Sequence, residues 1–155
     1  MTPEQRLADL GIELPAAPKA MGLYRAVLVV DGFAYTSGHG PLKSDGKLVC
    51  GRLGDGMDIQ AGYDAARLTG LALLASLRDA LGSLDRVDRL VKTLGLVQAT
   101  PDFTEHPAVV NGFSELMRQV FGDEAGVAAR SAFGAASLPA GMAVEVEAVF
   151  RVKDA

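Results

Sequence analysis

The residues best suited to chemistry lie near the C-terminus, in the stretch RSAFGAASLPAGMAVEVEAV (130–149). We expect Arg130 to lie in a loop of small residues, where no acidic neighbour in the sequence neutralises it. A guanidinium in such a setting can bind a carboxylate through two parallel hydrogen bonds, because the two groups are planar and matched in geometry. The alternatives are a structural salt bridge to Glu145 or Glu147 and simple solvation. The alternation of glutamate with valine is also typical of a half-exposed strand.

Two glycine-rich stretches are candidates for phosphate binding, but neither completes a nucleotide-binding fingerprint. They are Gly38-His39-Gly40 and Gly54-Asp55-Gly56. The first follows an expected strand and leads into a proline and a turn rather than a helix, so it lacks the helix N-terminus that would bind a phosphate. Tight turns explain both stretches.

Metal and thiol chemistry have little support. His39 and His106 are far apart in the sequence, and no cluster of histidine, cysteine and carboxylate has ligand spacing, so we expect no metal site. No nucleophile-elbow motif supports a serine triad. Cys50 is the only cysteine, and its apolar strand-like surroundings predict a buried, inert thiol.

The bulk properties predict a globular domain and exclude some classes of partner. The chain has 155 residues, 49% of them hydrophobic and 22% charged, which suits one domain with a proper core. A net charge of −4 without a block of Lys or Arg makes nucleic acid an unlikely partner. We find no signal peptide, no apolar run long enough for a membrane and no possible intramolecular disulfide, so we expect a cytoplasmic protein.

The first half of the chain predicts a short helix followed by strands. Thr2 and Pro3 suit a helix start and Gly11 its end, and an extended arm then reaches residue 20. Residues 24–30 and 33–37 form an expected hairpin around an Asp-Gly turn, and KLVCGRL (47–53) is expected to form a third strand.

The second half alternates helices and strands. Apolar residues recur every three or four positions over 58–81, which predicts a long amphipathic helix. A strand is expected over 90–100, a second helix over 106–121 and an alternating strand over 143–152. This order, β-β-β-α-β-α-β, predicts an α+β two-layer sandwich with two helices on one face of a mixed sheet. The other face carries both Glu145 and Val149, and we expect copies of the chain to associate through it.

Several segments together resemble the RidA (reactive intermediate deaminase A, YjgF-like) family. The stretch ARSAFGAASLPAGMAVEVEAV is similar to the family's Arg-Ser-Cys, Leu-Pro and Glu-X-Glu-Ala signature. In order along the chain, GLYRAV, YTSGHGP, the strand segment DRLVKTLGLVQATPDF and the helix segment VVNGFSELM also resemble family segments. The resemblance runs from about residue 20 to the end, so we divide the chain into an N-terminal helix and arm (1–20) and one RidA-like domain (21–155).

The resemblance implies a chorismate-mutase-like fold assembled as a homotrimer, with pockets between subunits. It implies a cofactor-free deaminase that hydrolyses enamine and imine intermediates such as 2-aminoacrylate to a 2-keto acid and ammonia. The partner would be a small carboxylate-bearing imine or keto-acid-like metabolite. Arg130 would hold its carboxylate and Glu145 would position the attacking water. Tyr24, Gly38 and Asn111 would line the pocket, with His39 beside them.

Two departures from the family pattern leave other functions open. Ala132 stands where many members have cysteine, and His39 replaces the usual glutamine. His39 could alter substrate choice or pH dependence, or it could be a packed, neutral side chain. One alternative function is a non-catalytic trimer that binds metabolites or proteins. An endoribonuclease is the other, and the acidic composition argues against it.

Overall fold

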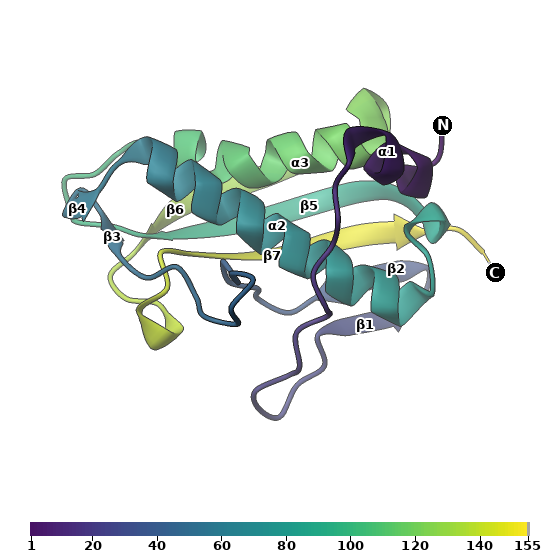
Figure 1. Cartoon of the computed structure of the whole chain (residues 1–155), viewed down its shortest axis with the longest axis horizontal. Coiled ribbons are helices and arrows are strands. Elements are labelled where there is room, and N and C mark those ends of the chain that lie inside the picture. Colours follow the sequence, from purple (N-terminus) through teal and green to yellow (C-terminus); the bar gives the residue numbers. More distant parts are fainter. Residues whose placement is uncertain (155) are drawn as a thin grey trace.

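The computed structural model describes residues 1–154, and Figure 1 shows its helices lying across one sheet. Residues 1–154 form three α-helices, two 3₁₀ turns and seven strands. In order these are α1 (Pro3–Leu10), β1 (Val27–Val30), β2 (Phe33–Thr36), β3 (Arg52–Leu53), β4 (Gly56–Met57), α2 (Ile59–Leu81), η1 (Leu84–Arg86), β5 (Val87–Gln98), α3 (His106–Gly126), β6 (Ala129–Ala135), η2 (Pro139–Gly141) and β7 (Val144–Val152).

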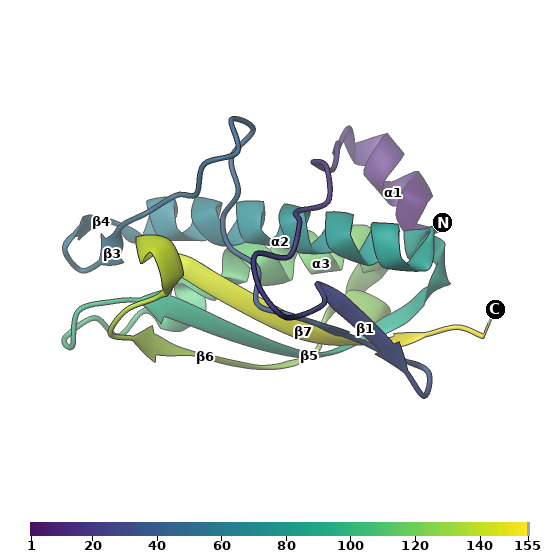
Figure 2. The same cartoon turned by 90° about the horizontal axis from the view of Figure 1, so that it is seen from below.

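The main sheet has the strand order β1-β2-β7-β5-β6, and its β5–β6 pair is parallel while the other pairs are antiparallel. Both long helices cover the same face, and Figure 2 shows the opposite face without a covering layer. The predicted two-layer α+β sandwich with a mixed sheet is therefore confirmed. No helix within residues 1–154 is long and apolar enough to cross a membrane.

The helices form where the periodicity predicted them, and their ends have clear causes. Asp58 caps α2 by accepting a hydrogen bond from the Ala61 amide at 2.8 Å, and Gly82 ends the helix with a positive φ of 82°. The helices approach each other closely at Gly112, where a Cβ atom would clash with the main chain of Tyr63. Their facing sides and the inner face of β7 form the core, which includes Leu73, Phe113 and Phe150.

The uncovered face of the sheet carries both apolar and charged side chains. By strand register its apolar side chains include Leu28, Tyr35, Leu94, Leu96, Phe133 and Val149, and its charged ones include Lys92, Glu145 and Glu147. Leu28, Tyr35 and Phe133 are each about half exposed, at 51%, 44% and 49%. Several large exposed apolar side chains on one uncovered sheet face are typical of an interface.

Helix α1 is attached firmly to the ends of the other elements. Leu7 is buried in the core, and both carboxylate oxygens of Glu4 bind Arg78, at 2.6 and 3.1 Å. Glu4 also accepts a hydrogen bond from the amide of Leu84 at 2.9 Å. The arm that follows crosses α2 and leads to β1 (Figure 1).

Three expectations from the sequence are wrong. Residues 47–53 form no third strand of the main sheet. They make isolated bridges, at Leu48 and Cys50, and the short β3 that pairs with β4. Because this segment lies outside the sheet, Cys50 is exposed rather than buried. The third error concerns Arg130, which belongs to a strand, β6, rather than to a loop.

Candidate functional site

Arg130 lies on the edge strand β6 and points toward the helices. Its partner in the parallel ladder is Thr93, which is buried beneath the helix layer. The Nη1 atom of Arg130 donates to Ser114 Oγ at 3.0 Å, and Nη2 donates to the main-chain oxygen of Pro107 at 3.3 Å. Both acceptors belong to α3, so the guanidinium is held between the sheet edge and that helix.

The positive charge of Arg130 has no carboxylate partner within residues 1–154. The ion pairs of this part of the chain involve other residues, so the expected alternative of a salt bridge to Glu145 or Glu147 is wrong. The side chain is half-buried, and burial lowers the pKa of Arg130 from its ordinary value. Arginine nevertheless stays protonated in proteins. A partly desolvated cation held only by neutral acceptors is well suited to bind an anion.

Asn111 lies beside this arginine. It is exposed on α3, four residues after Pro107 and three before Ser114, and these spacings place all three on one face of the helix. We call Arg130, Asn111, Ser114 and Pro107 the arginine cluster. Ser114 was not expected from the sequence, although its spacing of three from Asn111 in VVNGFSELM was an available signal.

Glu145 lies on β7, on the uncovered face of the sheet. Its partner across the ladder is Leu96. Its carboxylate packs against the main chain of Gly38, where an added Cβ would lie only 2.6 Å from Oε2. Burial, and next the negative charge of Glu147, raise the pKa of Glu145 above its ordinary value. A raised pKa makes a carboxylate more basic than a free glutamate, which suits it to accept a proton.

A hydrogen bond joins the sequence neighbours of Tyr24 and Gly38. The hydroxyl of Ser37, the neighbour of Gly38, donates to the carbonyl of Arg25 at 2.6 Å. Tyr24 is 48% exposed, and its hydroxyl accepts a hydrogen bond from the Met21 amide at 3.1 Å. We call Glu145 and Gly38 the glutamate cluster, and Tyr24 makes no hydrogen bond to either residue within residues 1–154.

His39 is buried, and its ring points into the helix layer. Nδ1 must donate to the carbonyl of Ser37, at 2.7 Å, so in the neutral ring Nε2 accepts from Ser76 Oγ at 2.8 Å. Burial lowers the pKa of His39, which favours this neutral form. Its main chain pairs with Val146 in both directions, at 2.9 and 3.0 Å. The structure therefore shows the packed, neutral histidine, and neither ring nitrogen is left for a ligand.

The two clusters lie on opposite faces of one sheet. Thr93 and Leu96, the β5 partners of Arg130 and Glu145, are three residues apart in a ladder without a bulge between them. Side chains alternate between faces along a strand, so an odd spacing places them on opposite sides. The structure thus brings Arg130 together with Asn111, and Glu145 together with Gly38. Within one chain it does not bring the two clusters together.

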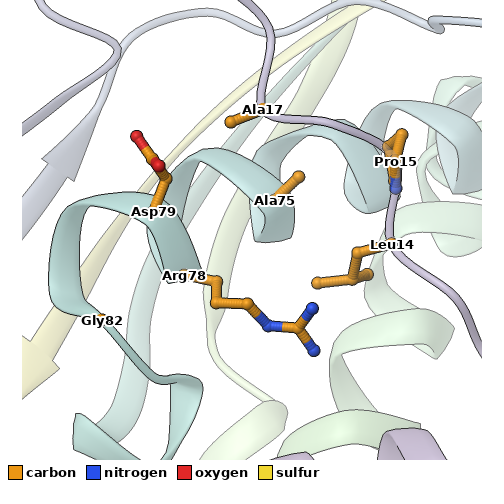
Figure 3. A pocket seen from close by; sticks show the side chains of 7 residues that line it. All are labelled: Leu14, Pro15, Ala17, Ala75, Arg78, Asp79 and Gly82. Carbon is orange, nitrogen blue, oxygen red and sulfur yellow. The ribbon is translucent and has the colours of Figure 1, made fainter.

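A solvent-open recess of about 370 Å³ lies elsewhere, between the N-terminal arm and the C-terminal end of α2 (Figure 3). Arg78 points into this region, but Glu4 already neutralises its charge. Neither Arg130 nor Glu145 lines the recess. In the part of the chain that the structure describes, no three His, Cys, Asp or Glu side chains gather as a metal site would require.

Comparison with known proteins gives a consistent result along the chain. The model of the family described as "YjgF/chorismate mutase-like, putative endoribonuclease" matches residues 4–148. Protein TCP17 of Trypanosoma cruzi is 40% identical over 148 residues, covering 96% of this chain and 92% of that protein. The family match includes most of the N-terminal segment, which the resemblance in the sequence did not reach.

Two solved structures are similar over nearly the whole chain. A "putative endoribonuclease" from Shewanella oneidensis is 33% identical with a TM-score of 0.92, covering 98% of this chain and 100% of that one. A protein of unknown function from Agrobacterium tumefaciens is 36% identical with a TM-score of 0.88, covering 97% and 92%.

Proposed function

Because the chain belongs to the YjgF/chorismate-mutase-like family, we propose that it is a cofactor-free hydrolytic deaminase of small enamine and imine intermediates. The proposed substrates resemble 2-aminoacrylate, and the products are a 2-keto acid and ammonia. The observation that carries this proposal is the state of Arg130, a half-buried cation whose partners in residues 1–154 are both neutral.

Arg130 supports a carboxylate-bearing substrate for a physical reason. An aspartate or glutamate partner would cancel the charge, whereas Ser114 and the Pro107 carbonyl orient the guanidinium without neutralising it. Arginine has five N–H donors, and the two bonds to α3 use two of them. Three donors remain, which is enough for a bidentate contact with a substrate carboxylate. E. coli TdcF, whose structure was solved with bound serine, is 22% identical and is similar in fold.

Glu145 would act on water. In the proposed reaction the enamine first gains a proton on carbon and becomes the iminium. Water oxygen then bonds to the iminium carbon while Glu145 accepts one proton, which gives a neutral carbinolamine. Glu145 returns that proton to the nitrogen, and the C–N bond breaks as the hydroxyl proton is lost to Glu145 and then to the departing ammonia. Iminium and water thus yield keto acid and ammonium. The iminium is already electrophilic, so orientation of substrate and water is the main task, and no cofactor is needed.

The two clusters would meet only between copies of the chain. We propose a homotrimer in which the arginine cluster of one copy faces the glutamate cluster of the next. The exposed apolar side chains on the uncovered face support this assembly, because Leu28, Tyr35 and Phe133 would otherwise stay in water. Cyclic symmetry would repeat the same contact three times and produce three equivalent pockets.

The test is keto-acid release from 2-aminoacrylate generated in situ by a serine dehydratase. We expect the wild-type protein to accelerate release above the uncatalysed background, and we expect Arg130→Ala to abolish the acceleration. Equal rates with wild type, with Arg130→Ala and without protein would reject the deaminase. Saturable binding without product would then point to a metabolite-binding trimer. RNA cleavage that is lost in both Arg130→Ala and Glu145→Ala would point to an endoribonuclease.

A further inference from the structure

The two contacts that hold Arg130 differ in kind. The Pro107 contact uses a main-chain oxygen, which would be present with almost any residue at that position, and it is the longer of the two at 3.3 Å. The Ser114 contact, at 3.0 Å, is the only hydrogen bond from Arg130 to another side chain within residues 1–154. A substitution at position 114 can therefore remove this contact, whereas the Pro107 contact depends only on the main chain.

A single anchor would leave the guanidinium free to turn. Arginine has a long, flexible side chain, and a planar group held at one nitrogen can still swivel about that bond. Anchors on Nη1 and Nη2 together define the direction of the guanidinium plane. This direction determines where the remaining N–H donors point, and bidentate binding of a carboxylate tolerates little error in it.

The chemical type of the anchor matters as well. A serine inside a helix often donates its hydroxyl to the carbonyl four residues earlier. Here the oxygen of Ser114 accepts from Arg130, which requires only its lone pairs and leaves the guanidinium charge intact. Asn111, one turn away, does not replace it, because no hydrogen bond joins Asn111 to Arg130 in residues 1–154.

We propose that Ser114 is a positioning residue that aims the Arg130 guanidinium at the substrate carboxylate. This inference rests on the proposed function and names a further residue of the same site. Because Ser114 acts through Arg130 on a carboxylate that is present in both the bound substrate and the transition state, its loss weakens binding and leaves the chemical step largely unchanged.

The experiment compares Ser114→Ala, Ser114→Thr and Ser114→Asp. Ser114→Ala raises KM about tenfold with kcat within about twofold of wild type, as for a lost hydrogen bond to a charged group. Ser114→Thr keeps the hydroxyl and restores KM. Ser114→Asp places a carboxylate on the guanidinium, competes with the substrate and raises KM more than Ser114→Ala does. Alanine is a strong helix former, so the melting temperature of Ser114→Ala stays close to that of wild type.

The matched control is Ser44→Ala, an exposed serine in a turn far along the chain from the arginine cluster. Equal KM values for Ser114→Ala and Ser44→Ala would overturn the inference, and so would a fall in kcat alone.

The dissociation constant for pyruvate, measured by calorimetry on the same proteins, separates this inference from the deaminase activity. Absent turnover combined with pyruvate binding that needs Arg130 and weakens in Ser114→Ala would reject the deaminase and support Ser114. Wild-type protein that does not bind pyruvate would overturn the role of Ser114.

Discussion

Arg130 and Glu145 occupy adjoining regions of the same sheet but point to opposite faces, Arg130 toward α3 and Glu145 away from the helices. A single chain therefore cannot use both on one small molecule. This relationship makes the site model depend on assembly, and assembly can be tested independently of the chemistry.

The first prediction is that two inactive variants restore activity when their subunits are mixed. Arg130→Ala and Glu145→Gln should each be inactive alone, because each site would need the arginine of one copy and the glutamate of another. After co-expression in equal amounts, random cyclic trimers should recover roughly a quarter of wild-type activity. Keto-acid release by the purified mixture measures this. Mixed trimers that stay inactive would reject a site shared between copies.

The second prediction concerns the uncovered face of the sheet. Leu94→Asp places a negative charge directly opposite Glu147, where association would have to bury two like charges together. We expect a folded monomer with no deaminase activity, since the two clusters would no longer meet. Sedimentation gives the oligomeric state and circular dichroism the folded content. An active monomer would contradict the model.

The third prediction is that Gly38→Ala damages activity more than stability. A Cβ there would lie 2.6 Å from Glu145 Oε2, so the flexible carboxylate must move. Displacement of a catalytic group by about 1 Å can cost on the order of a hundredfold in rate. Gly40→Ala is the matched control, because its Cβ would meet another flexible side chain, Met142, also at 2.6 Å. The two variants should melt at similar temperatures, and only Gly38→Ala should lose kcat.

The fourth prediction links Glu147 to the pH profile. The negative charge of Glu147 helps to raise the pKa of Glu145, after the larger effect of burial. If Glu145 must be ionised to accept a proton, activity rises with pH through this raised pKa. In Glu147→Gln the pKa of Glu145 should fall, so the acidic limb of kcat/KM should move to lower pH. Burial remains, and the limb should therefore stay above the ordinary range for glutamate. If the acidic limb of kcat/KM lies at the same pH in Glu147→Gln as in wild type, Glu147 does not influence the catalytic group.

The fifth prediction concerns stability and His39. Burial holds the pKa of His39 in the folded state below the ordinary histidine value of 6.5, so below that pH the unfolded chain binds more protons than the folded chain. The stabilising contribution is present above pH 6.5 and is lost as the pH falls toward the lowered folded value. Thermal melts of wild type should show this loss, and His39→Gln, which does not titrate, should flatten it. Parallel pH dependences in the two proteins would contradict it.

The two long helices, the first hairpin and the central strand β7 could be predicted locally. Apolar residues recur with a 3.6-residue period over 58–81 and alternate strictly over 143–152. Each pattern predicts which side of its element is buried. Strand β6 was missed for the opposite reason. ARSAFGA is rich in small residues with little strand propensity, and it becomes a strand because β5 provides a parallel partner. Residues 47–53 show the reverse case. Their apolar sequence resembles a strand, but they make only isolated bridges and the short β3 outside the main sheet.

The sequence by itself determined the two-layer fold and the presence of an arginine and a glutamate in a recognisable order. Local periodicity and residue type carry that information. Only the tertiary structure decided the faces on which these residues lie, the neutral partners that hold Arg130, and the burial of the His39 ring against Ser76. Strand register and helix packing set these relationships, and both depend on contacts between segments far apart in the chain, which no local pattern specifies.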